Sequence, residues 1–317
     1  MNKDIVFLIN KSEITAGTRG SSLGPESIIT AARKKGNSVF GDYPIQLIKD
    51  QNHLLDQKTT HEFAKHIDGL LAVYNDLNDK VSNILLNKKF PLVLAADHGS
   101  AGGTIAGIKT AFPEKKIGIV WIDAHADIHT PYTTPSGNMH GMPLATVLNE
   151  DNLACKMNVL PEATLKYWNE LKQIGGIYPK ANPEHLVYIA VRDTEEQENK
   201  IIEQLNVKNF SVETLREKGI TNVINEIEEK LSDCDLIYVS FDVDSMDPDL
   251  TSYGTGTPVK NGISPAEAND LLKAFAKNKK TVCIEFVEVN PCLDEKINTM
   301  AEITLDLIET VLNELKN

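Results

Sequence analysis

The sequence predicts an α/β protein with a mostly parallel sheet covered by helices on both faces. Segments typical of strands alternate with segments typical of helices along the chain. The strand segments are continuous apolar runs, which is typical of strands buried on both faces of a parallel sheet. No linker or low-complexity tract divides the 317 residues. We therefore expect one domain over residues 1–317, with about eight strands.

The expected strands are short apolar runs of β-branched and aromatic residues, bounded by turn signals. The weakest of them is the short run at 46–48. In chain order, strands are expected at residues 5–9, 46–48, 90–96, 117–122, 186–191, 209–212, 236–241 and 281–289.

The segments between these strands carry helix signals. Pro25 can open a helix over 26–36, because proline is tolerated in a first turn. Ser264 and Glu267 have the spacing of a capping box at the start of another helix. Apolar spacing of three and four predicts an amphipathic helix over about 60–86. Further helices are expected at 99–112, from about 142, at 163–173, 195–205, 221–231 and 301–316.

Two loop regions call for separate interpretation. The glycine-rich turn at 16–25 lacks the spacing and the lysine of a phosphate-binding loop, so we interpret it as a tight turn. Residues 152–183 contain a helix-like segment between proline-containing loops. We expect this region to be an insertion near the mouth of a site.

Composition narrows the possible partners. The net charge of −13 disfavours nucleic acid and anionic membranes, whose binding depends on clustered Lys and Arg, and is compatible with a cationic small molecule. The four cysteines lack C-x-x-C spacing, as expected of reduced thiols in a cytoplasmic protein. The first apolar run is too short and too charged for a signal peptide or a membrane anchor.

Titratable residues follow three of the expected strands, where parallel sheets bind their ligands. In an extended backbone, residues two apart point to the same side. Four clustered carboxylates would repel one another unless cations balanced them. Oxygen ligands with two imidazoles and no thiolate favour Mn²⁺-like ions, and two such ions suit metal-assisted hydrolysis. Singly, each group is more often a cap or a solvated residue; together they predict a metal centre of His98, Asp123, His125, Asp127, Asp242 and Asp244.

Four motifs resemble those of the ureohydrolase family and, within it, the arginases. The resemblance runs in order from the Gly24-Pro25 turn to the final helix, and SGN-x-HGMP is its most arginase-like part. Deacetylases are related metal amidohydrolases that share this type of fold. The motifs are DAHAD at 123–127, SGNMHGMP at 136–143, SFDVDSMDP at 240–248 with TGTP at 255–258, and EVNP at 288–291.

The resemblance implies two Mn²⁺ ions and hydrolysis of L-arginine to L-ornithine and urea by a metal-bridging hydroxide. Asp123 and Asp242 would bind both ions, with His98 and Asp127 completing one set and His125 and Asp244 the other. Asp127 would also orient the hydroxide.

The resemblance also implies roles for residues outside the metal sets. His140 matches the family's proton shuttle, and Glu288 matches the carboxylate that pairs with the guanidinium, although Glu285 is a rival on composition alone. Further substrate contacts are expected from His129, Ser136, Asn138, Asp193, Glu195 and Thr257.

Some residues depart from the arginase pattern. His129 stands where arginases usually have Asn, Glu195 where an Asp is common, and Gly99 where Ser is usual; Ala95 and Ala96 replace a Gly-Gly pair. The nearest alternative is another ureohydrolase, an agmatinase or a guanidino-acid hydrolase. A non-catalytic relative is less favoured, since every expected ligand is retained. Family members often form trimers or hexamers, so a homo-oligomer is possible.

Overall fold

The computed structural model describes residues 3–316 as a single domain built on one sheet of eight parallel strands. Its strand order is β2-β1-β3-β8-β7-β4-β5-β6, and every neighbouring pair is parallel. The predicted fold class is confirmed. The strands are β1 (Ile5–Asn10), β2 (Ile45–Leu47), β3 (Phe90–Ala95), β4 (Ile117–Ile122), β5 (Leu186–Ile189), β6 (Lys208–Phe210), β7 (Leu236–Asp242) and β8 (Thr281–Val287).

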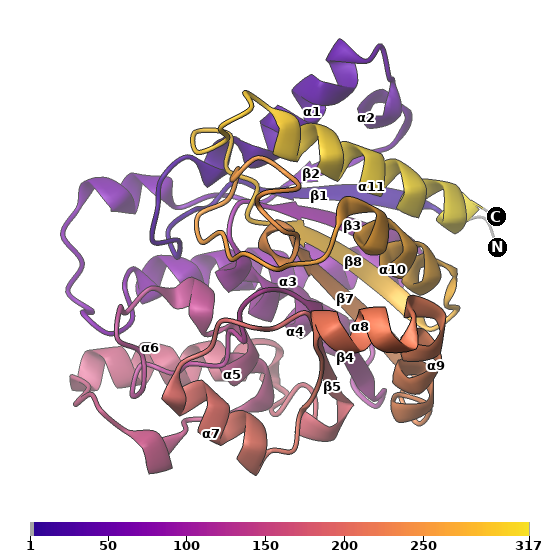
Figure 1. The fold of residues 1–317 in the computed structure, drawn as a ribbon. Coiled ribbons are helices and arrows are strands. Elements are labelled where there is room, and N and C mark those ends of the chain that lie inside the picture. Colours follow the sequence, from indigo (N-terminus) through magenta and orange to yellow (C-terminus); the bar gives the residue numbers. More distant parts are fainter. Residues whose placement is uncertain (1–2, 317) are drawn as a thin grey trace.

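Helices cover the two faces of the sheet and bury an apolar cluster on each (Figure 1). The one-turn helix α2 (Val39–Asp42) lies beside the first helix. One face carries α1 (Gly24–Lys34), α8 (Val212–Lys218), α9 (Ile220–Lys230), α10 (Pro265–Lys277) and α11 (Thr299–Lys316). The other carries α3 (Ile67–Leu86), α4 (Ala101–Ala111), α5 (Pro143–Leu148), α6 (Glu162–Gln173) and α7 (Glu196–Gln204).

Three helices differ from the prediction, and the one-turn helix α2 is one that was not expected. Helix α3 begins at Ile67 rather than near residue 60, because His66 has a left-handed φ of 55° that an α-helix does not accept. Helix α8 was not expected, although Ser211 caps it by accepting a hydrogen bond from the Thr214 backbone N–H.

The interpretation of residues 152–183 as an insertion near the mouth of a site is wrong for most of its length. Helix α6 contacts α3 and α5 and belongs to the helical layer, because Trp168 and Leu171 are fully buried there. Only the start of the segment reaches a site loop, where the Met157 backbone N–H donates to the Tyr132 carbonyl at 2.8 Å.

The glycine-rich turn satisfies its own backbone groups. Glu13 Oε2 accepts hydrogen bonds from the backbone N–H groups of Gly20 at 2.8 Å and Ser22 at 2.9 Å. The donors that could have bound a phosphate are therefore already used by a carboxylate of this chain, which agrees with a structural turn.

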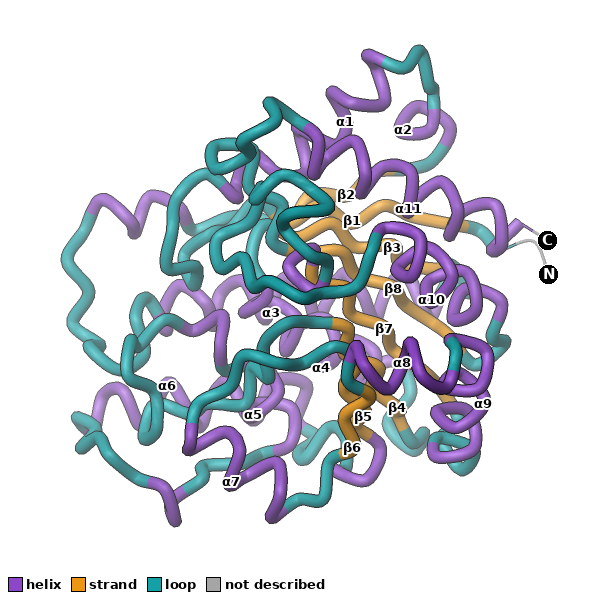
Figure 2. The backbone as a smooth tube through the Cα atoms, in the orientation of Figure 1, coloured by secondary structure: helices purple, strands orange, loops and turns teal. Residues whose placement is uncertain are grey.

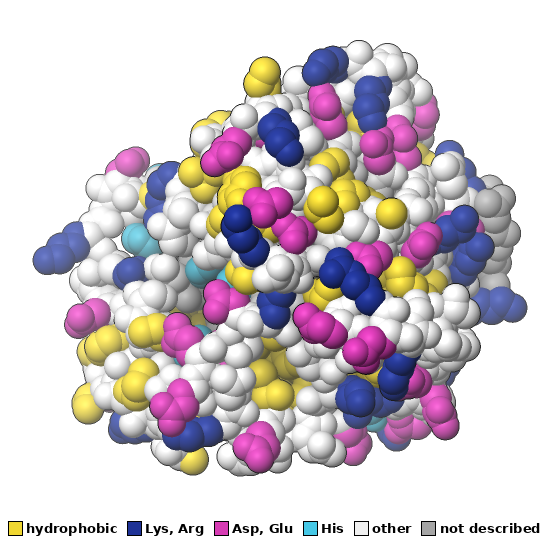
Figure 3. All heavy atoms as spheres, in the orientation of Figure 1, with side chains coloured by type: hydrophobic (Ala, Val, Ile, Leu, Met, Phe, Trp, Pro, Cys, Tyr) yellow, Lys and Arg dark blue, Asp and Glu magenta, His cyan; other side chains and the backbone are white. Residues whose placement is uncertain are grey.

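The long loops gather at the carboxyl edge of the sheet (Figure 2). The central strands β3, β8, β7 and β4 all end at this edge. Basic and acidic side chains are interspersed over the face shown in Figure 3. Within the part of the chain that the structure describes, no helix is long and apolar enough to cross a membrane.

Candidate metal centre and substrate pocket

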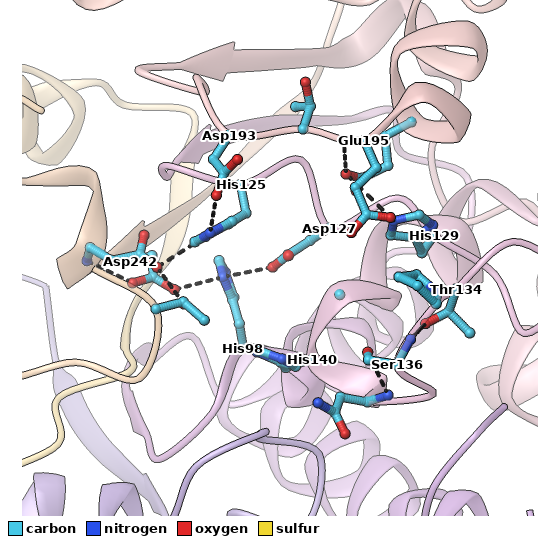
Figure 4. A pocket seen from close by; sticks show the side chains of 17 residues that line it. His98, His125, Asp127, His129, Thr134, Ser136, His140, Asp193, Glu195 and Asp242 are labelled. Carbon is cyan, nitrogen blue, oxygen red and sulfur yellow. Dashed lines mark hydrogen bonds and ion pairs between the residues drawn. The ribbon is translucent and has the colours of Figure 1, made fainter. Parts of the chain in front are cut away.

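A cavity of about 270 Å³ opens at the carboxyl edge of the sheet (Figure 4). Among the described residues that line the cavity there is no Lys or Arg. Two of the predicted site residues, Asp123 and Glu288, lie beneath the lining rather than on it. The others all line the cavity: His98, His125, Asp127, His129, Ser136, Asn138, His140, Asp193, Glu195, Asp242, Asp244 and Thr257.

The imidazole of His98 faces three carboxylates. Its Nδ1 lies 2.9 Å from Asp123 Oδ2, 3.1 Å from Asp127 Oδ2 and 3.2 Å from Asp242 Oδ2. Its Nε2 is 2.7 Å from Ser240 Oγ, which fixes the orientation of the ring. Nδ1 is buried, yet no contact around it has hydrogen-bond geometry. A buried nitrogen without a hydrogen-bond partner, surrounded by carboxylate oxygens, fits a metal ligand.

A second group shares Asp123 with the first. His125 Nδ1 lies 3.0 Å from Asp244 Oδ2 and 3.6 Å from Asp123 Oδ1, while its Nε2 faces Asp193 Oδ2 at 3.7 Å. Thr257 Oγ1 donates to Asp244 Oδ2 at 3.0 Å. A hydrogen-bonding group behind a metal-binding imidazole or carboxylate is the usual support of such a ligand. Both groups hold three ligand atoms close enough to share one ion.

The electrostatics of the cluster also fit cations. Burial, together with the negative charges of Asp244 and Asp123, raises the pKa of Asp242 well above its usual range. Burial and the charge of Asp123 raise the pKa of Asp127 to about 6. These carboxylates are crowded enough to resist ionisation, and divalent cations remove that cost.

The backbone reaches this arrangement differently from the prediction. The expectation of an extended chain through residues 123–127 is wrong, because β4 ends at Ile122 and Asp127 has a left-handed φ of 48°. Asp244 lies in a short 3₁₀ turn rather than on a strand. The ligands still converge. Local turns orient their side chains, although the prediction had assigned this to the alternation of side chains along a strand. Left-handed non-glycine residues are often found at functional sites.

His140 and Glu288 lie side by side next to the His98 group. Glu288 Oε1 accepts a hydrogen bond from the His98 backbone N–H at 2.9 Å and lies 3.6 Å from His140 Nδ1. Burial lowers the pKa of His140, but the hydrogen bond and charge of Glu288 outweigh it and raise that pKa. The rival Glu285 is fully buried and accepts a hydrogen bond from Tyr238 Oη at 2.7 Å, so it is a core residue.

The far end of the cavity holds a histidine between two glutamates. His129 Nε2 lies 3.1 Å from Glu195 Oε2 and 3.6 Å from Glu198 Oε2, and its Nδ1 contacts Thr133 Oγ1 at 3.1 Å. Burial lowers the pKa of His129 to about 4 and raises that of Glu198 to about 8. Both groups are therefore largely uncharged at pH 7.

Sequence reasoning missed two residues in this region. Glu198 lines the cavity and closes a capping box with Glu195, a spacing that the sequence does show. Lys65 Nζ donates to Asn138 Oδ1 at 3.1 Å, although 73 residues separate the two and no local pattern joins them. Ser136 Oγ accepts from the Asn138 backbone N–H at 3.2 Å, which orders the loop that carries both residues.

Comparison with known proteins gives consistent results. A family model described as "Arginase family" matches residues 3–313. The arginase of Bacillus subtilis is 34% identical over 321 residues, covering 99% of each chain. The solved arginase of Bacillus caldovelox has a TM-score of 0.82 at 30% identity, covering 98% of this chain and 99% of that one. An Entamoeba histolytica arginase, solved in complex with L-ornithine, has a TM-score of 0.82 at 28% identity, with 98% and 99% covered.

Proposed function

This chain is a hydrolase that belongs to the arginase family, and we propose that it hydrolyses L-arginine to L-ornithine and urea at a pair of Mn²⁺ ions. The observation that carries the proposal is the pair of ligand groups joined at Asp123, beside a cavity with no Lys or Arg among its described lining residues. Such a lining suits a cationic guanidinium.

The donor set supports the choice of metal. Its ligands are carboxylate oxygens and two imidazole nitrogens, a mixture that suits Mn²⁺ better than thiolate-seeking ions. His98, Asp123, Asp127 and Asp242 would bind one ion, and Asp123, His125, Asp242 and Asp244 the other. Two bound ions would supply positive charge and a water activated for attack at neutral pH.

The residues of this chain would do the remaining chemistry. Asp127 faces the cavity from a fixed left-handed turn and would accept a proton from the attacking water. Glu288 would hold the guanidinium so that its central carbon faces that water. His140, whose pKa is raised by Glu288, would pass a proton to the departing amine of ornithine.

The amino-acid end of the substrate would lie toward the far end of the cavity. Ser136 and Asn138 present a hydroxyl and an amide for an α-carboxylate, and Glu195 presents a carboxylate for an α-ammonium group. Thr257 would hold Asp244 in place rather than touch the substrate, since its hydroxyl is already donated.

Agmatine is the second candidate substrate, favoured by one observation. The far end carries Glu195 and Glu198 around His129, whose Nε2 is turned toward them and not toward open cavity. His129 Nε2 is therefore not available as a hydrogen-bond donor to an α-carboxylate, and such a group would depend on the Ser136 loop for its donors. The arginine proposal is favoured because that loop retains its ordered hydroxyl and amide.

The test is a parallel assay of urea release. Mn²⁺-loaded protein is incubated with L-arginine, agmatine and 4-guanidinobutyrate, and a chelated sample is the control. We expect urea from L-arginine at the highest kcat/KM and none after chelation. Urea from agmatine but not from L-arginine would overturn the substrate assignment and leave the metal mechanism standing.

A further inference from the structure

A second cluster of metal-ligating side chains lies at the opposite edge of the sheet. His185 directly precedes β5, and Asp233 and Cys234 shortly precede β7. The imidazole, carboxylate and thiol each offer one atom within 4.8 Å of the others. Because β4 alone spans six residues, or about 20 Å, this cluster is remote from the carboxyl-edge centre.

The cluster is largely buried on one side and open on the other. His185 is 3% exposed and Cys234 is 2% exposed, whereas the side chain of Asp233 is 52% exposed. His185 Nε2 points to Asp233 Oδ2 at 3.3 Å and to Glu184 Oε1 at 3.6 Å. Cys234 is a free thiol, and among residues 3–316 no partner donates a hydrogen bond to its sulfur.

We propose that His185, Asp233 and Cys234 form a second cation site, for a thiophilic divalent ion such as Zn²⁺. One sulfur, one nitrogen and one oxygen make three protein ligands, the number found at zinc sites whose fourth position is taken by water. A thiolate and an imidazole select such ions over Mn²⁺, so this site and the carboxyl-edge centre differ in metal preference.

Binding requires two local exchanges. The Cys234 thiol loses its proton to solvent as the sulfur–metal bond forms, and burial raises the pKa of that thiol to about 11 in the absence of a cation. The Lys116 ammonium, 2.8 Å from Asp233 Oδ2, moves aside. Both members of that ion pair are more than half exposed, and exposed pairs contribute little to stability.

The position of the site predicts its effect. A bound ion would tie the segment before β5 to the segment before β7, two strands that flank β4 in the sheet. It would therefore raise the melting temperature of the protein and leave the carboxyl-edge ligands untouched.

The test follows Cd²⁺ as a thiophilic probe on the full chain, after Mn²⁺ loading and removal of free metal. Thiolate-to-Cd²⁺ charge transfer gives a near-ultraviolet band, which the carboxyl-edge centre cannot produce because its lining has no cysteine. We expect the band to saturate at one Cd²⁺ per chain. It should persist in Cys155→Ser and Cys292→Ser, whose thiols are more accessible, and vanish in Cys234→Ser.

A variant at the surface tests the site without changing a buried residue, so its result does not depend on the folding of Cys234→Ser. Asp233→Asn changes an exposed side chain and should weaken Cd²⁺ binding about tenfold or more, with the unliganded melting temperature preserved. At the same Zn²⁺ concentration, the melting temperature of the wild type should rise by more than that of this variant. A band that survives in Cys234→Ser, or equal affinity in Asp233→Asn, would overturn the proposal. None of these readouts depends on urea release.

Discussion

At the scale of single residues, His140 allows proton transfer to be tested separately from metal binding. His140 lines the cavity 3.6 Å from Glu288 and is not among the groups that could hold an ion. Replacing His140 should therefore reduce turnover without changing the amount of metal bound.

We predict that His140→Asn lowers kcat about 10²- to 10⁴-fold, the usual contribution of a positioned acid–base group. The metal content, measured by mass spectrometry, should match that of the wild type. The control is His53→Asn, which alters an exposed histidine. A variant that retains full kcat would remove His140 from the mechanism.

Glu195 gives a prediction about substrate affinity. Its carboxylate faces the cavity beside His129, where an α-ammonium group would lie. Replacing it by Gln removes a charge-assisted contact, so KM for L-arginine should rise about tenfold or more while kcat changes little. Glu196→Gln, on the next, exposed residue, is the matched control. Equal KM values in the two variants would contradict this role.

Single residues also show how much of the site could be predicted from the sequence. The sequence predicted all the residues of the two ligand groups, because metal binding depends on residue types that can be recognised in the sequence. It did not show that His129 Nε2 faces Glu195 and Glu198, since that contact depends on where α7 begins relative to the DAHAD turn.

Composition alone left Glu285 as a rival, and the EVNP motif selected Glu288. Both are buried in the structure, but Glu285 bonds to Tyr238 within the core, whereas Glu288 contacts the His98 backbone and lies beside His140.

At the scale of elements, the loop at 136–141 depends on a close backbone approach. Gly137 has a φ of +75°, and a Cβ there would lie 2.0 Å from the Glu62 carbonyl oxygen. The same loop is tied to its neighbour by a hydrogen bond from the Lys65 backbone N–H to the Gly137 carbonyl at 2.8 Å. The conformation of the substrate loop therefore requires glycine at this position.

We predict that Gly137→Ala destabilises the protein by about 1–3 kcal/mol, measured by urea unfolding, because both the φ and the contact oppose a side chain. Gly141→Ala is the control in the same loop, since nothing lies within 4 Å of its added Cβ and its φ is not positive. Equal stability of the two variants would show that the loop adapts.

A buried lysine near α6 gives a pH-dependent prediction. Lys180 is 2% exposed and donates to the Lys172 carbonyl at 2.7 Å, and burial lowers its pKa from 10.5 to about 8. Between pH 8 and 10.5 the unfolded chain holds a proton there that the folded chain has lost. Stability therefore gains from this group as pH rises through that window, by about 3 kcal/mol in total.

Lys180→Met removes this group and should flatten that gain. The free energies of unfolding of variant and wild type are compared at pH 7 and pH 10, and their difference should shift by about 2–3 kcal/mol in favour of the wild type at the higher pH. A pH-independent difference would show that Lys180 titrates as an exposed lysine does.

Element boundaries illustrate why local patterns are only partly predictive. The capping box at Ser264 was identified correctly because both of its hydrogen bonds are local. The start of α3 was misplaced because its apolar spacing continues upstream of His66, where the backbone turns left-handed. Residues 163–173 were correctly assigned as a helix, but its burial against α3 and α5 depends on contacts that lie far apart in sequence.

At the scale of the whole molecule, strand order decides which ligands meet. The alternation of strands and helices predicted a parallel sheet, yet it did not show that β8, the last strand, lies between β3 and β7. That placement brings Glu288 next to His98, a pair 190 residues apart. The family resemblance had assigned both residues to the site, but the strand order and the contact between them came from the structure.

Two ions in the carboxylate cluster are central to the proposed hydrolysis of L-arginine. The most direct measurement titrates metal-free protein with Mn²⁺ and records bound metal per chain and urea release from L-arginine in the same samples. We expect the rate to rise as binding approaches two ions per chain and to disappear on chelation. Full urea release by protein shown to be free of metal would contradict it.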